Sequence, residues 1–159
     1  MRSLILGILF LTVLSSCLTK TIDPNSIEGK LVTAINTTCS PSGKCTIRLK
    51  DVTDFDWDRV YVFNYANSQS QIEELIGAPF PKYQEFQRSI IFFNGGKIVY
   101  SESLPTDIER PLKDQVVFDI AGRGTYRVYS SESRFDVQRE NNERPVYYKL
   151  TLIQTPPIN

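Results

Sequence analysis

Apolar residues near the start of the chain recur with the period of a helix. The positions on this face are Ile27, Leu31, Val32 and Ile35. Asp23 and Pro24 precede them, and an aspartate cap followed by proline in the first turn is a typical helix start. The spacing therefore predicts a helix here, although the end of the segment, residues 30–36, also has the composition of a strand.

A second, shorter helix is predicted over residues 68–77. Ser68 or Ser70 would lie near its cap, and Gly77 would end it. The positions expected to face inward are Ile72, Leu75 and Ile76. The prolines that follow, at positions 79 and 81, interrupt regular structure and predict a loop.

Most of the remaining chain alternates with the period of a strand. Strand segments are predicted within 45–52, 58–65, 88–103, 115–130 and 133–154, and the last three each contain a pair of strands. The clearest hairpin flanks Asn94-Gly95-Gly96, residues that tolerate positive φ. Because most links are short, we expect antiparallel pairing. The sequence predicts one α+β domain over residues 25–155, with a curved antiparallel sheet of about six or seven strands and one or two helices packed on one face.

The segment 54–65, DFDWDRVYVFNY, is the most distinctive part of this pattern. Its aromatic residues all have odd numbers: Phe55, Trp57, Tyr61, Phe63 and Tyr65. If the segment is extended, these side chains share one face, and Asp54, Asp56 and Asp58 point to the other. The alternation favours aromatic side chains in the core, although aromatic residues are also enriched at binding sites.

The three aspartates also match the opening of a calcium loop. The rest of that motif is absent, because Arg59 stands where the loop needs glycine and Tyr65 stands where it needs glutamate. A solvated acidic edge is therefore favoured over a metal site. We take Asp54, Asp56 and Asp58 as candidate partner-binding residues and expect no cofactor.

Composition excludes several classes of function. The chain has 18 basic and 18 acidic residues and no histidine. A balanced charge gives no reason to expect nucleic acid as a partner, and the commonest general base is missing. Neither Asn94-Gly95-Gly96 nor Gly122-Arg123-Gly124 has the setting of a phosphate loop. Catalysis is disfavoured, while a lysine-assisted serine or paired carboxylates remain open alternatives.

Two cysteines, Cys39 and Cys45, flank the tip Ser-Pro-Ser-Gly-Lys. Proline and glycine can turn the chain back here, so that the two sulfurs meet. In an exported protein we expect a structural disulfide. The alternatives are a redox pair, which usually has C-x-x-C spacing, and a metal site, for which further ligands are not evident.

The first residues have the pattern of an export signal. Arg2 precedes an apolar block of eleven residues, Leu4 to Leu14, which is too short to span a bilayer as a helix. Leu14-Ser15-Ser16-Cys17 resembles the lipobox of bacterial lipoproteins. The resemblance implies a signal peptide over residues 1–16, lipids on Cys17 and a tether over residues 17–24. The alternative is an ordinary signal peptide that contains a cysteine.

A second resemblance concerns the segment from Thr53 to Gly77. Its Phe-x-Trp-Asp-x-x-Tyr-Val-Phe core leads into a short helix, as in a group of small uncharacterised bacterial lipoproteins. The group implies no particular activity. A weaker similarity, through Gly77-Ala78-Pro79 and the following hairpin, is to small outer-membrane assembly and inhibitor-type lipoproteins. The extra strands and the cysteine loop of this chain depart from that pattern.

These features together predict a lipoprotein of the cell envelope. Leu18 after the lipidated cysteine favours the periplasmic face of the outer membrane, and in a single-membrane bacterium the same motif means the outer face of the plasma membrane. The leading hypothesis is a non-enzymatic protein-binding module, for example an immunity or inhibitor protein against an envelope-acting toxin or hydrolase. The alternatives are a structural role in envelope assembly or maintenance and an envelope enzyme.

Overall fold

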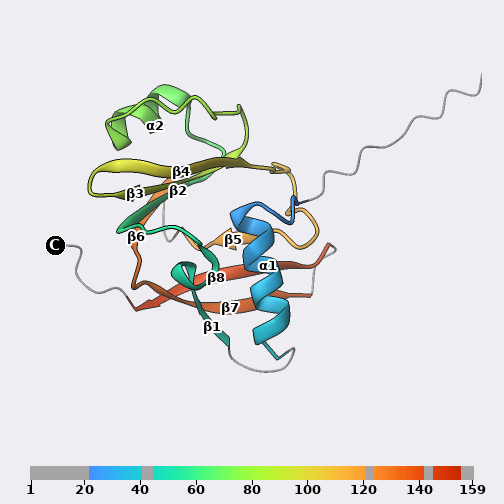
Figure 1. Ribbon diagram of the computed structural model, residues 1–159. Helices are drawn as coiled ribbons and strands as arrows, with labels where there is room; N and C mark the ends of the chain where they lie inside the picture. Colours follow the sequence, from blue (N-terminus) through green and yellow to red (C-terminus); the bar gives the residue numbers. More distant parts are fainter. Residues whose placement is uncertain (1–21, 41–44, 121–123, 142–144, 155–159) are drawn as a thin grey trace, which may run out of the picture.

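The computed structural model describes residues 22–40, 45–120, 124–141 and 145–154 (Figure 1). In chain order the elements are α1 (Ile27–Thr38), β1 (Cys45–Arg48), the 3-10 helix η1 (Leu49–Val52), β2 (Arg59–Phe63), α2 (Gln69–Ile76), β3 (Arg88–Asn94), β4 (Lys97–Leu104), β5 (Val116–Phe118), β6 (Tyr126–Ser130), β7 (Arg134–Glu140) and β8 (Tyr147–Gln154). The expected α+β class is confirmed. The predicted hairpins β3–β4 and β7–β8 are also present.

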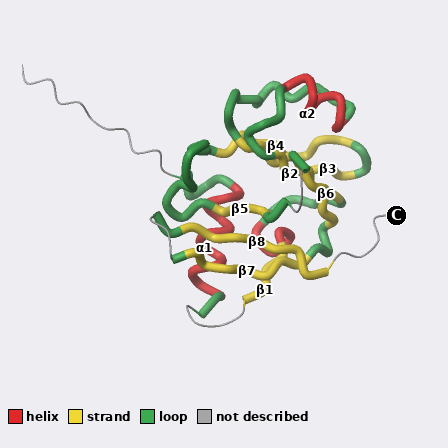
Figure 2. Tube along the Cα trace, turned by 180° about the vertical axis from the view of Figure 1, so that it is seen from behind, coloured by secondary structure: helices red, strands yellow, loops and turns green. Residues whose placement is uncertain are grey.

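The described residues form eight strands in two four-stranded sheets, instead of the single curved sheet of about six or seven strands that we expected. The first sheet has the order β1-β7-β8-β5, and the second has the order β4-β3-β2-β6. Figure 2 shows the two sheets from behind, one below the other. The expectation of antiparallel pairing fails at one place, since β5 pairs in parallel with β8. The chain passes from the first sheet to the second between β5 and β6, so these sequence neighbours are not partners.

The two helices pack in different hydrophobic cores. The larger core lies between the two sheets, and α1 contributes Ile27, Leu31 and Ile35 to it. A smaller core lies on the other face of the second sheet, where Ile72 of α2 packs with Phe63, Phe80, Ile91 and Phe93. The expectation that both helices pack on one face is therefore wrong. Both faces of the second sheet bear apolar side chains. One face is therefore covered by the first sheet and α1, and the other by α2 and the loop that follows it.

Local signals explain where the helices begin and end. Ser26, and not Asp23, caps α1, since its side chain accepts a hydrogen bond from the backbone N–H of Gly29 at 3.0 Å. Ser68 and Gln71 form a capping box on α2, and Gly77 ends this helix at φ 68°. Leu75, expected to face inward, is 40% exposed. Residues 30–36 belong to a helix, so the strand alternative is excluded.

The aromatic residues of segment 54–65 do not share one face. Phe55 and Trp57 pack in the core between the sheets, whereas Tyr61 and Phe63 pack in the smaller core. The reason is that β2 begins only at Arg59, so strand alternation does not extend back to Trp57. Within β2 the alternation holds, because Val60 and Val62 face the larger core.

Candidate functional site

The three candidate aspartates form one exposed group, called here the acidic row (Asp54, Asp56 and Asp58). All three are exposed, while Trp57 between them is only 4% exposed and Phe55 is half-buried. The expectation of outward carboxylates and inward aromatic rings is confirmed. The Phe55 ring stacks on Tyr100 with centroids 5.2 Å apart, and the Trp57 ring meets Phe92 edge-on at 5.0 Å. These contacts fix the backbone from which the carboxylates project.

Two members of the acidic row have local partners. Asp58 accepts a hydrogen bond from the backbone N–H of Gly95 at 2.7 Å, which ties the row to the turn between β3 and β4. Gly95 and Gly96 both have positive φ in that turn, 56° and 79°, which explains the two glycines. The Asp54 carboxylate lies 3.4 Å from the Lys30 ammonium and is 80% exposed, so this ion pair is weak. The Asp58 carboxylate also lies 3.7 Å from Nε of Arg59 and is 51% exposed, so this ion pair is weak as well. All three carboxylates of the row therefore remain accessible to solvent.

The acidic row does not have the arrangement of a metal site. Within the described part of the chain, no group of three or more histidine, cysteine, aspartate or glutamate side chains is placed to hold a metal ion. Within the row, Asp58 is held at the Gly95 N–H and Asp54 lies beside Lys30, so these two carboxylates contact different partners. The chemistry open to the row is attraction of a positively charged surface.

A cavity of about 240 Å³ lies at the opposite end of the second sheet. Its walls come from the end of β2, the start of β3, the end of β4, the loop 105–115 and β5. Most of the lining is apolar and includes Val62, Phe63, Leu104, Ile108, Val117 and Phe118. A cavity of about 150 Å³ already admits a benzene ring, so this one has room for apolar groups of that size. The sequence does not predict this cavity, because its walls come from segments that are far apart along the chain.

A buried ion pair holds one wall of this cavity. The carboxylate of Glu28, which is 1% exposed, accepts hydrogen bonds from the Arg88 guanidinium at 2.8 and 3.1 Å and from the Val116 N–H at 2.7 Å. Arg88 also donates to the Thr106 hydroxyl and to the carbonyls of Pro105 and Val116. The pair therefore joins α1, β3, β5 and the start of the loop 105–115. Its hydrogen bonds hold these four segments together.

A second carboxylate lies beside the ion pair. Glu102 accepts a hydrogen bond from the Ile27 N–H at 3.0 Å and another from the Tyr100 hydroxyl. Burial raises the pKa of Glu102, and the nearby Glu28 carboxylate adds to this effect. Burial and the Glu102 carboxylate also raise the pKa of Tyr100 above its usual range. These contacts fasten the first turn of α1 to β4.

Large apolar side chains are exposed around the cavity. Tyr65 and Ile108 line it, yet they are 42% and 60% exposed, so the cavity opens to the surface beside them. Phe86 is 61% exposed and lies two residues before Arg88, another lining residue. Phe86 also has a φ of 59°, which is unusual for a bulky side chain. We call the region formed by Tyr65, Phe86 and Ile108, at the end of the second sheet that bears the cavity, the apolar end.

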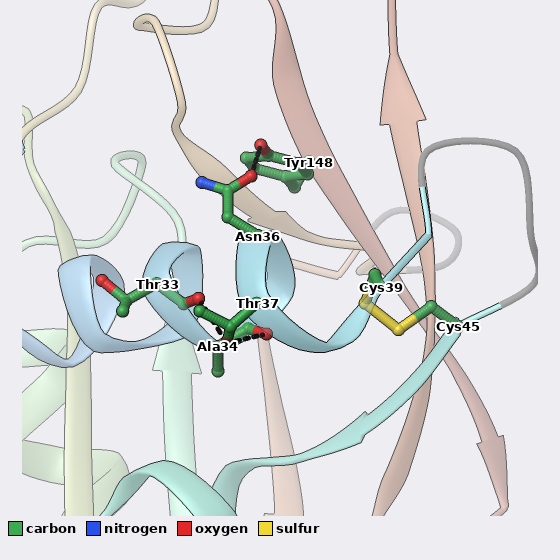
Figure 3. Close-up of a disulfide and its surroundings, with 7 residues drawn as sticks. All are labelled: Thr33, Ala34, Asn36, Thr37, Cys39, Cys45 and Tyr148. Atoms are coloured by element: carbon green, nitrogen blue, oxygen red, sulfur yellow. Dashed lines mark hydrogen bonds between the residues drawn. A yellow bond between two sulfur atoms is a disulfide. The ribbon is translucent and has the colours of Figure 1, made fainter.

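The expected disulfide joins Cys39 to Cys45 across 5.3 Å between their Cα atoms. Figure 3 shows that it connects the end of α1 to the start of β1. On the same helix the Asn36 side chain accepts a hydrogen bond from the Tyr148 hydroxyl at 2.7 Å (Figure 3). Both contacts hold the end of α1 against the first sheet. The tip between the cysteines, residues 41–44, lies outside the described residues.

Comparisons with known proteins add no assignment. No protein-family model, no curated protein and no solved structure matches this chain. Cys17 and the predicted signal peptide lie outside the described residues. Across the ranges that the structure describes, no helix is both long and apolar enough to cross a membrane.

Proposed function

We propose that this chain is a membrane-anchored periplasmic lipoprotein that binds another protein and catalyses no reaction. Lipids on Cys17 would hold it at the periplasmic face of the outer membrane. The acidic row would form the contact with the partner. One version of this function is an immunity or inhibitor protein that neutralises an envelope-acting toxin or hydrolase.

The observation that supports partner binding most strongly is the fixed display of the acidic row. Three carboxylates project from a short segment whose intervening rings, Phe55 and Trp57, are packed in the core. A preorganised charged surface loses little conformational entropy on binding and steers a partner of opposite charge. The partner surface is therefore expected to be basic.

The arrangement of the other charged groups also favours binding over catalysis. The buried carboxylate of Glu28 and the guanidinium of Arg88 are engaged with the backbone and with each other. Glu102, whose pKa is raised, is hydrogen-bonded to the first turn of α1 instead of facing the cavity. An acid–base site needs groups that can reach a substrate, and these groups are directed into the fold.

A photo-crosslinking experiment in cells tests this function. A benzophenone amino acid is placed at Asp56, and a matched probe is placed at Gln138, an exposed position on β7. The proposal expects one specific protein adduct from position 56 and none from position 138. The absence of an adduct at position 56, or the same adducts at both positions, would contradict it.

Lipidation is tested separately by mass spectrometry. The native chain should begin at Cys17 and bear acyl chains, and Cys17→Ala should leave an unprocessed or misplaced precursor. Finding a mature N-terminus without lipid would refute the anchor while leaving the acidic row open to test.

A further inference from the structure

The apolar end exposes side chains that folding alone does not explain. Phe86 and Ile108 are 61% and 60% exposed, and Tyr65 is 42% exposed. Exposed apolar side chains at the same end of a sheet as an apolar cavity are typical of an interaction surface. Phe86 also adopts a φ of 59°, a conformation that disfavours a bulky residue, and burial does not compensate for it.

Strand register places these residues at one end of the second sheet. Arg88 pairs with Leu104, so Phe86 and the loop that begins after β4 lie beyond the same end. Phe63 pairs with Ser89, so Tyr65 also extends beyond it. The acidic row is tied through Asp58 and Gly95 to the turn at the other end of the β3–β4 hairpin. Apolar and acidic surfaces therefore lie toward opposite ends of the sheet.

The start of the described chain lies on the same side as the apolar end. Ile22 and Pro24 line a surface cavity together with Lys113 and Asp114, which belong to the loop that bears Ile108. The next turn of the chain is fixed to β4 by the hydrogen bond from the Ile27 N–H to Glu102. Figure 1 shows the beginning of the described chain near the end of β4 and away from the β3–β4 turn.

The length of the tether limits how far this side can stand from the membrane. Five steps separate Cys17 from Ile22, and even fully extended they span only about 18 Å. A compact domain of this size has a radius of gyration of roughly 14 Å and is therefore roughly 36 Å across. The tether is shorter than the domain, so the side that bears Ile22 and the loop 105–115 stays closest to the lipid.

We propose that the apolar end, with Ile108 and Phe86 foremost, rests on the lipid surface in which Cys17 is anchored. This inference rests on the lipid anchor of the proposed function. Tyrosine and other apolar side chains favour the membrane interface, where their rings and alkyl groups leave water. The contact orients the domain and turns the acidic row away from the membrane.

The charges of the loop indicate which lipids suit this contact. Arg110 and Lys113 are outnumbered by Asp107, Glu109 and Asp114, so the loop has no excess of positive charge. Anionic lipid is attracted by clusters of basic residues, which are absent from this loop. The contact should therefore form on zwitterionic lipid and should be insensitive to salt.

Tryptophan quenching by brominated lipid tests the contact. The full lipidated chain is reconstituted in phosphatidylethanolamine–phosphatidylcholine vesicles, with or without bromine in the upper acyl chains. Ile108→Trp is compared with Ile153→Trp, since Ile153 is similarly exposed, at 55%, but lies on β8 in the first sheet. The native Trp57 is 4% exposed, and the unmodified chain supplies its baseline. Phe86→Trp is a second reporter at the apolar end.

An interfacial side chain lies about 5–10 Å into the headgroup–acyl boundary, so brominated lipid should remove about half or more of the emission added by Ile108→Trp and by Phe86→Trp. The emission added by Ile153→Trp should be unchanged. Equal quenching at positions 108 and 153, or none at positions 108 and 86, would overturn the contact and leave the apolar end to a protein partner or a second copy. Flotation of the vesicles tests the lipid anchor on Cys17 separately from the contact of the apolar end. If the vesicles float without the chain, the anchor is refuted as well as the contact.

Discussion

The buried pair between Glu28 and Arg88 gives the most demanding test of how the domain is held together. Its side chains are 1% and 10% exposed, and the Glu28 carboxylate accepts hydrogen bonds from Arg88 and from the Val116 N–H. Glu28→Gln keeps the shape of the side chain but leaves the guanidinium charge buried without its counter-ion. Removing one partner of a buried pair typically costs about 3–5 kcal/mol. That loss is a large share of the total stability of about 5–15 kcal/mol for a domain.

Urea unfolding followed by the emission of Trp57, the single tryptophan, measures this loss. Lys30→Gln is the control, because it removes the exposed ion pair with Asp54 and should cost no more than about 1 kcal/mol. The double variant Glu28→Leu with Arg88→Met replaces both charges by apolar groups. It should lose less stability than Glu28→Gln, since no unpaired charge remains. A loss below about 1 kcal/mol for Glu28→Gln would refute the reasoning.

Three further predictions address the rest of the fold. Cys39→Ala should lower the free energy of unfolding by about 2 kcal/mol without changing the fold, as urea titration and circular dichroism will show, because the disulfide closes a short loop. Trp57→Ala should lower the free energy of unfolding by about 3–5 kcal/mol, because it loses buried surface and leaves a cavity. Asn at all three positions of the acidic row should leave the melting temperature nearly unchanged, with or without calcium. The folded-state pKa of Glu102 is raised above the ordinary value of 4.5, so its stabilising contribution is complete below that value and is lost as pH rises through the raised pKa. The unmodified chain should therefore lose stability relative to Glu102→Gln as pH rises from about 4.5, and a difference that grows in the other direction would contradict this.

Local signals in the sequence predict the parts of this fold that depend on neighbouring residues. The capping box of α2, its end at Gly77 and the turn at Gly95-Gly96 each follow from residue types within a few positions. The disulfide follows in the same way, since its cysteines are six residues apart. These features do not depend on which strands meet in the folded protein.

The division into two sheets could not be predicted in this way. Alternation shows that β5 and β6 are strands, but it does not show that β5 joins β8 in parallel while β6 joins β2. Trp57 and Phe63 both have odd numbers, but they pack in different cores. The sequence does not reveal this, because β2 begins only at Arg59 and odd and even positions define faces only within one continuous strand.

The buried pair and the cavity depend on contacts between distant segments. Glu28 and Arg88 are 60 positions apart, and both are buried in elements whose other buried residues are mostly apolar. A charged residue in such a place is a signal that a partner exists, since an unpaired buried charge is costly. The signal does not name the partner. The acidic row, by contrast, could be found from sequence because its carboxylates lie within five consecutive positions.

The central claim is that the acidic row binds a basic protein partner, and the affinity of the partner captured at position 56 tests it most directly. The wild-type chain is compared with the variant that has Asn at Asp54, Asp56 and Asp58. Glu74→Gln, Glu85→Gln and Glu109→Gln, combined in one chain, give a control with the same change of charge at exposed positions elsewhere. If each exposed pair contributes about 0.2–1 kcal/mol, the first variant should bind roughly 3- to 150-fold more weakly, with a shallower dependence on salt. The control should bind like the wild type. Unchanged affinity of the Asp54, Asp56 and Asp58 variant, or an equal loss in both variants, would contradict the account.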